Sequence, residues 1–131
     1  MDLLSVVVKN PIEVHLKAVE GMAGFEPNQP LYDGETPVKI LLHHAGVYSD
    51  KWQNESNRQR KARENGTVQS AEVQREAQAK LYASVITGWT GIDQPFNYEN
   101  AIALLKPVES AWIRLQIDAA LSEAAKKQQP N

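Results

Sequence analysis

The chain has 131 residues, a formal net charge of -2, and a composition that is 42% hydrophobic and 23% charged. This length suits one domain with one hydrophobic core, and the low net charge gives no general attraction to nucleic acid or acidic lipid. The absence of cysteine excludes disulfides, thiolate catalysis and sulfur-ligated zinc. The sequence begins without the basic start and cleavage site of a signal peptide, and no apolar run approaches the roughly 20 residues of a membrane helix. We therefore expect a soluble intracellular protein.

Residues 1–48 form the part in which we expect strands. Apolar and polar residues alternate from Ile12 to Ala18, directly after Pro11, and this period of two predicts a strand with one buried face. The run Val38–Leu42 predicts a second strand. Residues 21–35, rich in glycine and proline, predict a long connecting loop. Two strands alone are marginally stable, so the pair must pack on the helices that follow.

Residues 49–126 form the part in which we expect helices. Three residues are suitable N-caps: Ser49 for a helix over Asp50–Glu64 that ends at Asn65-Gly66, Ser70 for a helix that ends near Thr87-Gly88, and Asn97 for a short helix ending at Lys106. Trp89–Pro95 is predicted to be a turn. Pro107 suits the first position of a last helix that runs to about Lys126, before a flexible tail at 127–131. The predicted fold is a mainly helical α+β single domain, with an antiparallel strand pair packed on about four helices.

Two of the expected helices are unbalanced in polarity. The helix over Asp50–Glu64 is polar on all sides except for Trp52 and Ala62, so it cannot be held by burying a face. The last helix carries two apolar stripes. We expect the first to face the core (Val108, Ala111, Trp112, Leu115, Ala119) and the second to form an interface (Ile113, Ile117, Ala120, Leu121, Ala124). The alternative is that the short preceding helix or the strand pair covers the second stripe.

The expected core and the expected interaction surface follow from these patterns. The core residues are predicted to be Leu81, Val85, Trp89, Phe96, Trp112 and Leu115, with Trp89 and Trp112 as anchors. The candidate surface for self-association or partner binding comprises Trp52, Arg58, Arg60, Arg63, Ile113, Ile117 and Leu121.

The residues that could carry chemistry give little support for an enzyme. His43 and His44 are adjacent at a strand end, so we expect their side chains on opposite faces, where they cannot hold one metal ion. The sequence contains no nucleophile elbow, phosphate-binding loop or dinucleotide fingerprint. We predict no catalytic residue, no cofactor and no metal.

A cluster of basic residues is the best case for nucleic-acid binding. Arg58, Arg60, Lys61 and Arg63 lie on one expected helix, but Glu55 and Glu64 interrupt the positive patch. Only Trp52 is available nearby for stacking on bases. A solvated helix face is therefore the favoured interpretation.

Three short segments in a fixed order resemble a known family. They are Val85–Ile92, which contains Thr-Gly-Trp; Pro95–Ala101, which contains Pro-Phe and Glu-Asn-Ala; and Ala111–Ile117, which begins Ala-Trp-Ile-Arg. This order is similar to that in the tail assembly chaperones of lambdoid, siphovirus-type long-tailed bacteriophages. The upstream half resembles the family more loosely, and the loop at 21–35 and Lys106-Pro107 depart from its pattern.

The resemblance implies a role in virion assembly in the host cytoplasm. Such chaperones bind the tape measure protein and the tail tube subunits, self-associate, and are absent from the mature virion. The family commonly also makes a longer product by ribosomal frameshifting. Two alternatives remain open: a structural head–tail connector or minor tail protein that stays in the particle, and a small nucleic-acid-binding regulator.

Overall fold

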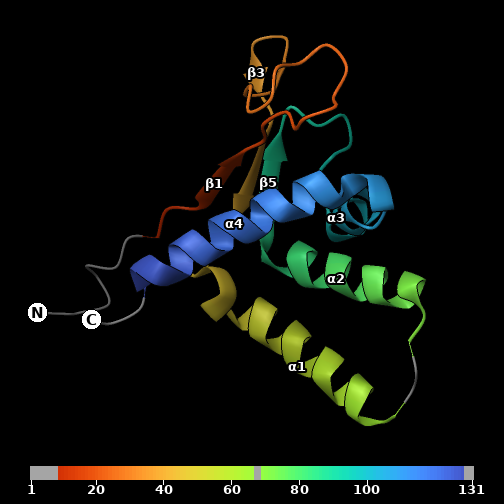
Figure 1. Cartoon of the computed structure of the whole chain (residues 1–131). Coiled ribbons are helices and arrows are strands. Elements are labelled where there is room, and N and C mark those ends of the chain that lie inside the picture. The colour runs from red at the N-terminus through yellow and green to blue at the C-terminus, as the bar shows by residue number, and fades with distance from the viewer. Residues whose placement is uncertain (1–8, 67–68, 129–131) are drawn as a thin grey trace, which may run out of the picture.

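The computed structural model describes residues 9–66 and 69–128 as an α+β fold with four α-helices (Figure 1). The strands are β1 (Ile12–His15), β2 (Tyr32–Asp33), β3 (Thr36–Pro37), β4 (Lys39–Leu42) and β5 (Ile86–Thr90). The α-helices are α1 (Asp50–Glu64), α2 (Ala71–Val85), α3 (Tyr98–Leu105) and α4 (Ala111–Gln128), and two 3₁₀ turns are η2 (Gly46–Tyr48) and η3 (Val108–Ser110). The mainly helical α+β class predicted from the sequence is confirmed.

The main sheet has three antiparallel strands in the order β1-β4-β5. The predicted pair is present, with Val14 opposite Ile40. The third strand is a correction, because Trp89 was expected to begin a turn, whereas it pairs with Ile40 within β5. Helix α2 ends at Val85 and the chain continues as a strand, since the unpaired edge of β4 offers hydrogen bonds that a turn would leave unmade.

The long connection between β1 and β4 is an ordered lobe. Residues 18–29 form a loop whose ends are joined, since the Ala18 N–H donates to the Gln29 carbonyl at 2.8 Å and the Asn28 N–H to the Ala18 carbonyl at 2.8 Å. A small hairpin of β2 and β3 follows it. Both lie above the main sheet in Figure 1, at the end of the molecule opposite to α1.

The helices begin where the sequence places their caps. The side chains of Ser49, Ser70 and Asn97 each accept a hydrogen bond from the backbone N–H three residues later. Gly66, with φ +78°, ends α1 in the left-handed conformation expected of this position. The last helix differs at both ends: the 3₁₀ turn η3 separates Pro107 from α4, and α4 continues through Gln128. Residues 127 and 128 of the predicted flexible tail are therefore helical, and 129–131 lie outside the described residues.

The core lies between the sheet and the inner face of α4, which crosses in front of the sheet in Figure 1. Its inner face consists of Ile113, Ile117 and Leu121, all buried, so their assignment to an interaction surface is wrong. Leu115, predicted for the core, is 69% exposed, and Val108 is also exposed. The two stripes are thus interchanged, and the covering of the second stripe by the strands agrees with the alternative interpretation.

Two sets of polar contacts fix the rotation of α4 about its own axis. The Arg114 guanidinium donates to the carbonyls of Leu105 and Pro107, which tie the start of α4 to the end of α3. The Gln116 side chain accepts a hydrogen bond from the Lys17 N–H and donates one to the Lys17 carbonyl, each at 2.9 Å. Both side chains flank the inner stripe, so they fix it against the sheet. Apolar periodicity alone does not contain this information.

The remaining core predictions have mixed outcomes. Val85 is fully buried, as predicted. Trp89 and Trp112 are partly buried and pack against the core from its margin, and Leu81 is also only partly buried. Phe96 is 37% exposed, so its assignment to the core is wrong. Its ring contacts the Trp89 ring edge-on, with centroids 5.2 Å apart, and so covers that ring from outside.

Candidate functional site

An open groove of about 1060 Å³ lies beside the N-terminal half of α1. The end of α2, the start of β5 and the start of α3 form its other wall. It is lined by His43, Ala45, Tyr48, Ser49, Asp50, Lys51, Asn54, Glu55, Arg58, Ala83, Ser84, Ile86, Thr87, Phe96 and Tyr98. A volume at the upper limit of small-molecule sites, combined with an open mouth, suits a segment of polypeptide better than an enclosed ligand.

Three exposed aromatic side chains line the groove. Tyr48, Phe96 and Tyr98 all line it, and all three are among the exposed large hydrophobic residues of the described chain. Aromatic side chains are enriched at the centres of protein interfaces because they bury a large area with few rotatable bonds. Of these residues the sequence prediction included only Phe96, and it placed Phe96 in the core.

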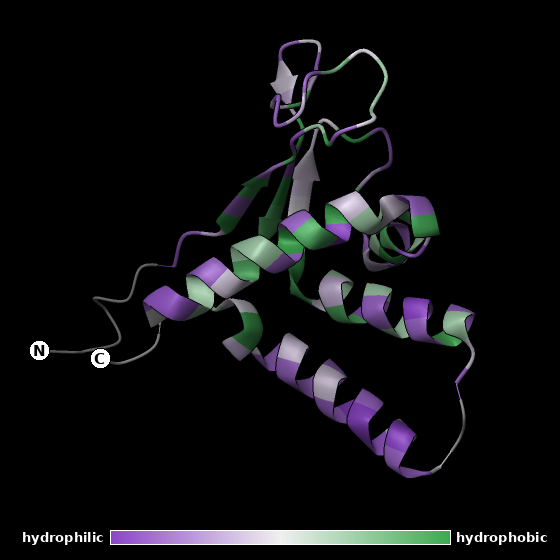
Figure 2. Ribbon diagram, viewed as in Figure 1, coloured by the Kyte–Doolittle hydropathy of each residue, from purple (hydrophilic) through white to green (hydrophobic). Residues whose placement is uncertain are grey.

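The polar wall of the groove is helix α1, which has no buried residue. It is held at its start by Trp52, whose ring lies 5.8 Å from the Tyr82 ring, and further along by Gln59, whose side-chain amide donates to the Ala77 carbonyl at 2.7 Å. These contacts replace the buried face that such a helix lacks. Figure 2 shows α1 as hydrophilic along most of its length.

Charges of both signs lie in the groove. Arg58 forms an ion pair with Glu55, which also accepts a hydrogen bond from Gln59 at 2.9 Å. Lys51 forms no ion pair within residues 9–66 and 69–128, so its ammonium group remains available to a partner. Asp50 lies in the first turn of α1, where the helix dipole favours a carboxylate.

Two groups in the groove have shifted pKa values. Burial lowers the pKa of His43, and the neighbouring charges of His44 and Lys51 lower it further. Burial raises the pKa of Tyr98, and the Glu55 carboxylate acts in the same direction. Both side chains therefore favour their neutral forms at pH 7, in which they can contact uncharged groups of a partner.

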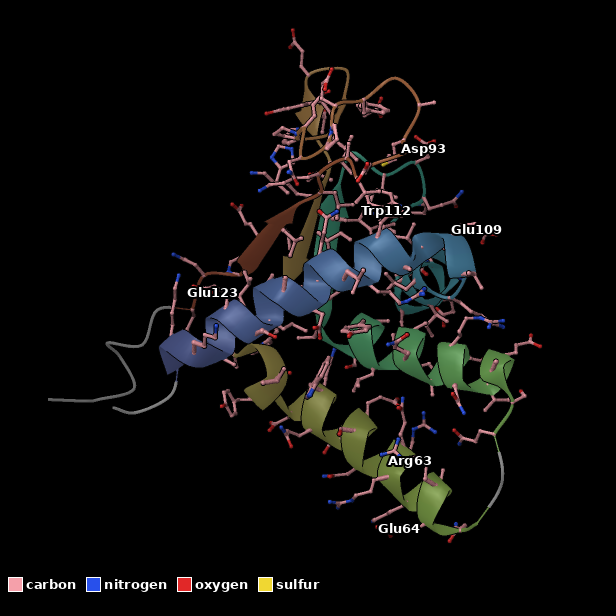
Figure 3. All side chains as sticks on the ribbon, in the orientation of Figure 1. Arg63, Glu64, Asp93, Glu109, Trp112 and Glu123 are labelled. Carbon is pink, nitrogen blue, oxygen red and sulfur yellow. The ribbon has the colours of Figure 1, made fainter. Side chains whose placement is uncertain are left out.

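The predicted surface residues do not form one patch. Arg58 lines the groove, whereas Trp52 packs on Tyr82 outside it. Arg63 lies with Glu64 near the far end of α1, well separated from Trp112 on α4 (Figure 3). Arg60 is near Glu64, with 4.0 Å between the charged groups. The basic cluster is thus spread along the helix.

The histidine pair differs from the prediction. His43 and His44 follow the last residue of β4, where the strand alternation no longer applies, and their rings stack with centroids 4.2 Å apart. The expectation of opposite faces is therefore wrong. No group of three or more metal-ligating side chains occurs in the part of the chain that the structure describes.

The outer stripe of α4 is a second exposed apolar feature. It comprises Val108 and Leu115, both well exposed, together with Ala119 and part of Trp112. Val108 lies in η3, just before α4, and Leu115 lies in the second turn of α4; neither lines the groove beside α1.

The segments that carry the family resemblance contribute mainly to the fold. In the first, the Trp89 indole N–H donates to the Gln94 carbonyl at 2.8 Å. In the second, Asn97 caps α3, and the Asn100 amide donates to the Pro95 carbonyl at 2.8 Å. The third supplies Arg114 and its contacts at the end of α3.

The sequence matches no family model, and no curated protein or solved structure matches it at a significant level. None of the helices in residues 9–66 and 69–128 has the length and apolar character to cross a membrane.

Proposed function

We propose that this protein is a non-enzymatic tail assembly chaperone of a long-tailed bacteriophage, which binds the tape measure protein, tail tube subunits and further copies of itself in the host cytoplasm. The family is proposed from the three short segments described above, and the activity from the groove. The observation that carries the proposal is the groove beside α1, where Tyr48, Phe96 and Tyr98 are exposed together.

The chemistry of the groove supports protein binding. Its aromatic rings offer apolar area, while Lys51, Asn54 and Thr87 offer hydrogen-bonding groups at its sides. This combination of an apolar centre and a polar rim is typical of transient protein interfaces. A chaperone that leaves the particle needs such reversible binding.

A co-expression experiment tests the proposal. The tagged protein is produced together with the proteins encoded by the neighbouring genes, and what it retains is identified by mass spectrometry. We expect capture of the tape measure protein, which a double variant Phe96→Ser/Tyr98→Ser reduces and the matched surface variant Tyr32→Ser does not. Retention of no tail protein by the wild type would refute the chaperone proposal.

The two alternatives make different predictions. A head–tail connector or minor tail protein is a stoichiometric component of purified virions, whereas the chaperone is absent from them. A nucleic-acid-binding regulator would bind DNA or RNA with a strong salt dependence.

A further inference from the structure

The lobe at the end of the molecule opposite to α1 is acidic and exposes aromatic rings. Residues 18–38 contain four acidic residues, Glu20, Glu26, Asp33 and Glu35, and no lysine, arginine or histidine. The lobe also exposes Phe25, whose exposed fraction is 45%, beside Glu26. An exposed phenylalanine next to a carboxylate, in a lobe without basic residues, is suited to a partner surface that is aromatic and basic.

The lobe is also held in one conformation. In addition to the contacts that join its ends, the Phe25 N–H donates to the Met22 carbonyl at 3.3 Å, and the Glu26 N–H donates to the Gln29 side chain at 3.0 Å. Asn28 adopts a left-handed conformation with φ +67°, which completes the turn. Such a loop loses little conformational entropy when it binds, because its backbone is already ordered.

The other end of the molecule has the complementary chemistry. Helix α1 carries five basic and three acidic residues, in contrast to the acidic lobe. The groove along it exposes three aromatic rings and the Lys51 ammonium group. Of the other charged residues in its lining, Arg58 is paired with Glu55, and Asp50 lies in the first turn of α1, so Lys51 is the cation that remains for an acidic partner. Figure 1 places the lobe and α1 at opposite ends, so one copy cannot bring its own lobe into its own groove.

We propose that the acidic lobe of one copy, with its exposed Phe25, docks into the groove beside α1 of the next copy. This inference rests on the self-association in the proposed function, and it names the two surfaces. Because the two surfaces are different, the contact is heterologous, and each copy can bind one neighbour at each end. The product is a ring or an open chain.

The outer stripe of α4 is the rival surface for self-association. Its large side chains, Val108 and Leu115, line neither the groove beside α1 nor the small hollow between α1 and α2. The lobe, in contrast, is acidic, and the groove of the next copy has a wall, helix α1, that carries more basic than acidic residues. We therefore assign the contact to the ends of the molecule and use Leu115 as the control.

Single variants provide the first test, in which size exclusion with light scattering measures the molar mass at a protein concentration on the order of tens of micromolar. We expect the wild type to run larger than a monomer, and to dissociate toward monomer at about 1 M salt, where the Debye length is about 3 Å. Phe25→Ser should weaken association about thirtyfold, the loss typical of a central aromatic contact. Glu26→Lys and Lys51→Glu should weaken it about tenfold, with folding of each variant verified by circular dichroism.

Matched controls separate the proposed contact from general effects of charge or exposure. Lys61→Glu changes the same charge on the same helix but lies outside the groove lining, and it should leave association nearly unchanged. Leu115→Ser should also have no effect. A monomeric wild type, or loss of association in Leu115→Ser with retention in Phe25→Ser, would overturn the inference.

A mixing experiment tests the heterologous geometry directly. A Phe25→Ser copy keeps an intact groove, and a Lys51→Glu/Tyr98→Ser copy keeps an intact lobe. Each variant alone should be monomeric, but the mixture should form a one-to-one dimer and nothing larger. Assemblies larger than a dimer, or no heterodimer at all, would contradict a contact between lobe and groove.

The outcomes for the two proposals can be distinguished. If the wild type is monomeric and still retains the tape measure protein, the inference fails and the chaperone proposal stands. If the mixture forms the dimer and no tail protein is retained, the inference stands and the chaperone proposal fails.

Discussion

The interchange of the two stripes on α4 leads to a prediction that compares two substitutions in one helix. Ile117 has an exposed fraction of 0%, whereas Leu115, two residues earlier, is 69% exposed. Ile117→Ala removes fully buried methyl and methylene groups and leaves a cavity, so it should lower the free energy of unfolding by about 2–5 kcal/mol. Leu115→Ala removes mostly hydrated carbon and gains helix propensity, so its effect should lie within about 0.5 kcal/mol of zero.

The measurement is urea denaturation followed by circular dichroism, at protein concentrations low enough to keep the chain monomeric. A loss of the predicted size is a large part of the total stability of a small domain, which is about 5–15 kcal/mol, so it is easily resolved. If Leu115→Ala costs more than Ile117→Ala, then the rotation of α4 described above is wrong. The core would then have to be built on the other stripe.

Three further predictions concern other parts of the fold. Gln116→Leu removes both side-chain hydrogen bonds to Lys17, so it should lower the free energy of unfolding by about 1–2 kcal/mol and speed hydrogen exchange at the Lys17 amide. Unchanged exchange would show that these bonds do not hold this segment against α4. Gly91→Ala places a Cβ 2.9 Å from the Pro37 carbonyl oxygen at a φ of +71°, and it should lower the free energy of unfolding by about 3 kcal/mol or more. Gly34→Ala, at φ +62° with no atom within 4 Å of the added Cβ, should lower it by about 1 kcal/mol. Equal losses in denaturation experiments would contradict the close approach at Gly91. Burial raises the pKa of Tyr82 to about 12, and the charge of Asp118 and the hydrogen bond from Tyr82 to it act in the same direction. The resulting stabilisation of the fold is complete below pH 10 and is lost as the pH rises toward 12. Stability measured against pH should therefore fall less over this interval in Tyr82→Phe than in the wild type, and identical profiles would contradict the shift.

Much of the fold could be predicted because it depends on local signals. The cap residues Ser49, Ser70 and Asn97 fixed the starts of three helices, since a side-chain acceptor is required there whatever the tertiary structure. The alternation from Ile12 to Ala18 likewise identified a strand with one buried face, although the strand itself ends at His15.

The errors arose where distant residues decide the structure. Strand β5 forms because β4 offers an unpaired edge, and no local sequence pattern at Trp89 predicts this pairing. The rotation of α4 depends on Gln116 reaching Lys17, a contact between residues 99 positions apart.

The groove could not be predicted for the same reason. Tyr48, Phe96 and Tyr98 come from two distant parts of the sequence, and only the packing of α3 near the start of α1 brings them together. The sequence does contain one local signal for the groove: each of the three aromatic residues lies next to a helix cap, Ser49 or Asn97, where a large side chain is readily left exposed.

Helix α4 packs against β1, although the two elements lie far apart in the sequence, and this separation affects the chain while it is being synthesised. Lys17 and Gln116 are 99 residues apart, so at a synthesis rate of about 5–20 residues per second roughly 5–20 s separate their appearance. During that interval the apolar face of the nascent sheet, with Val14 and Ile40, has no helix to cover it. A chain that stops before α4 keeps this face uncovered permanently. Ribosomal stalling or premature termination before α4 is complete should therefore yield aggregates rather than a smaller folded protein.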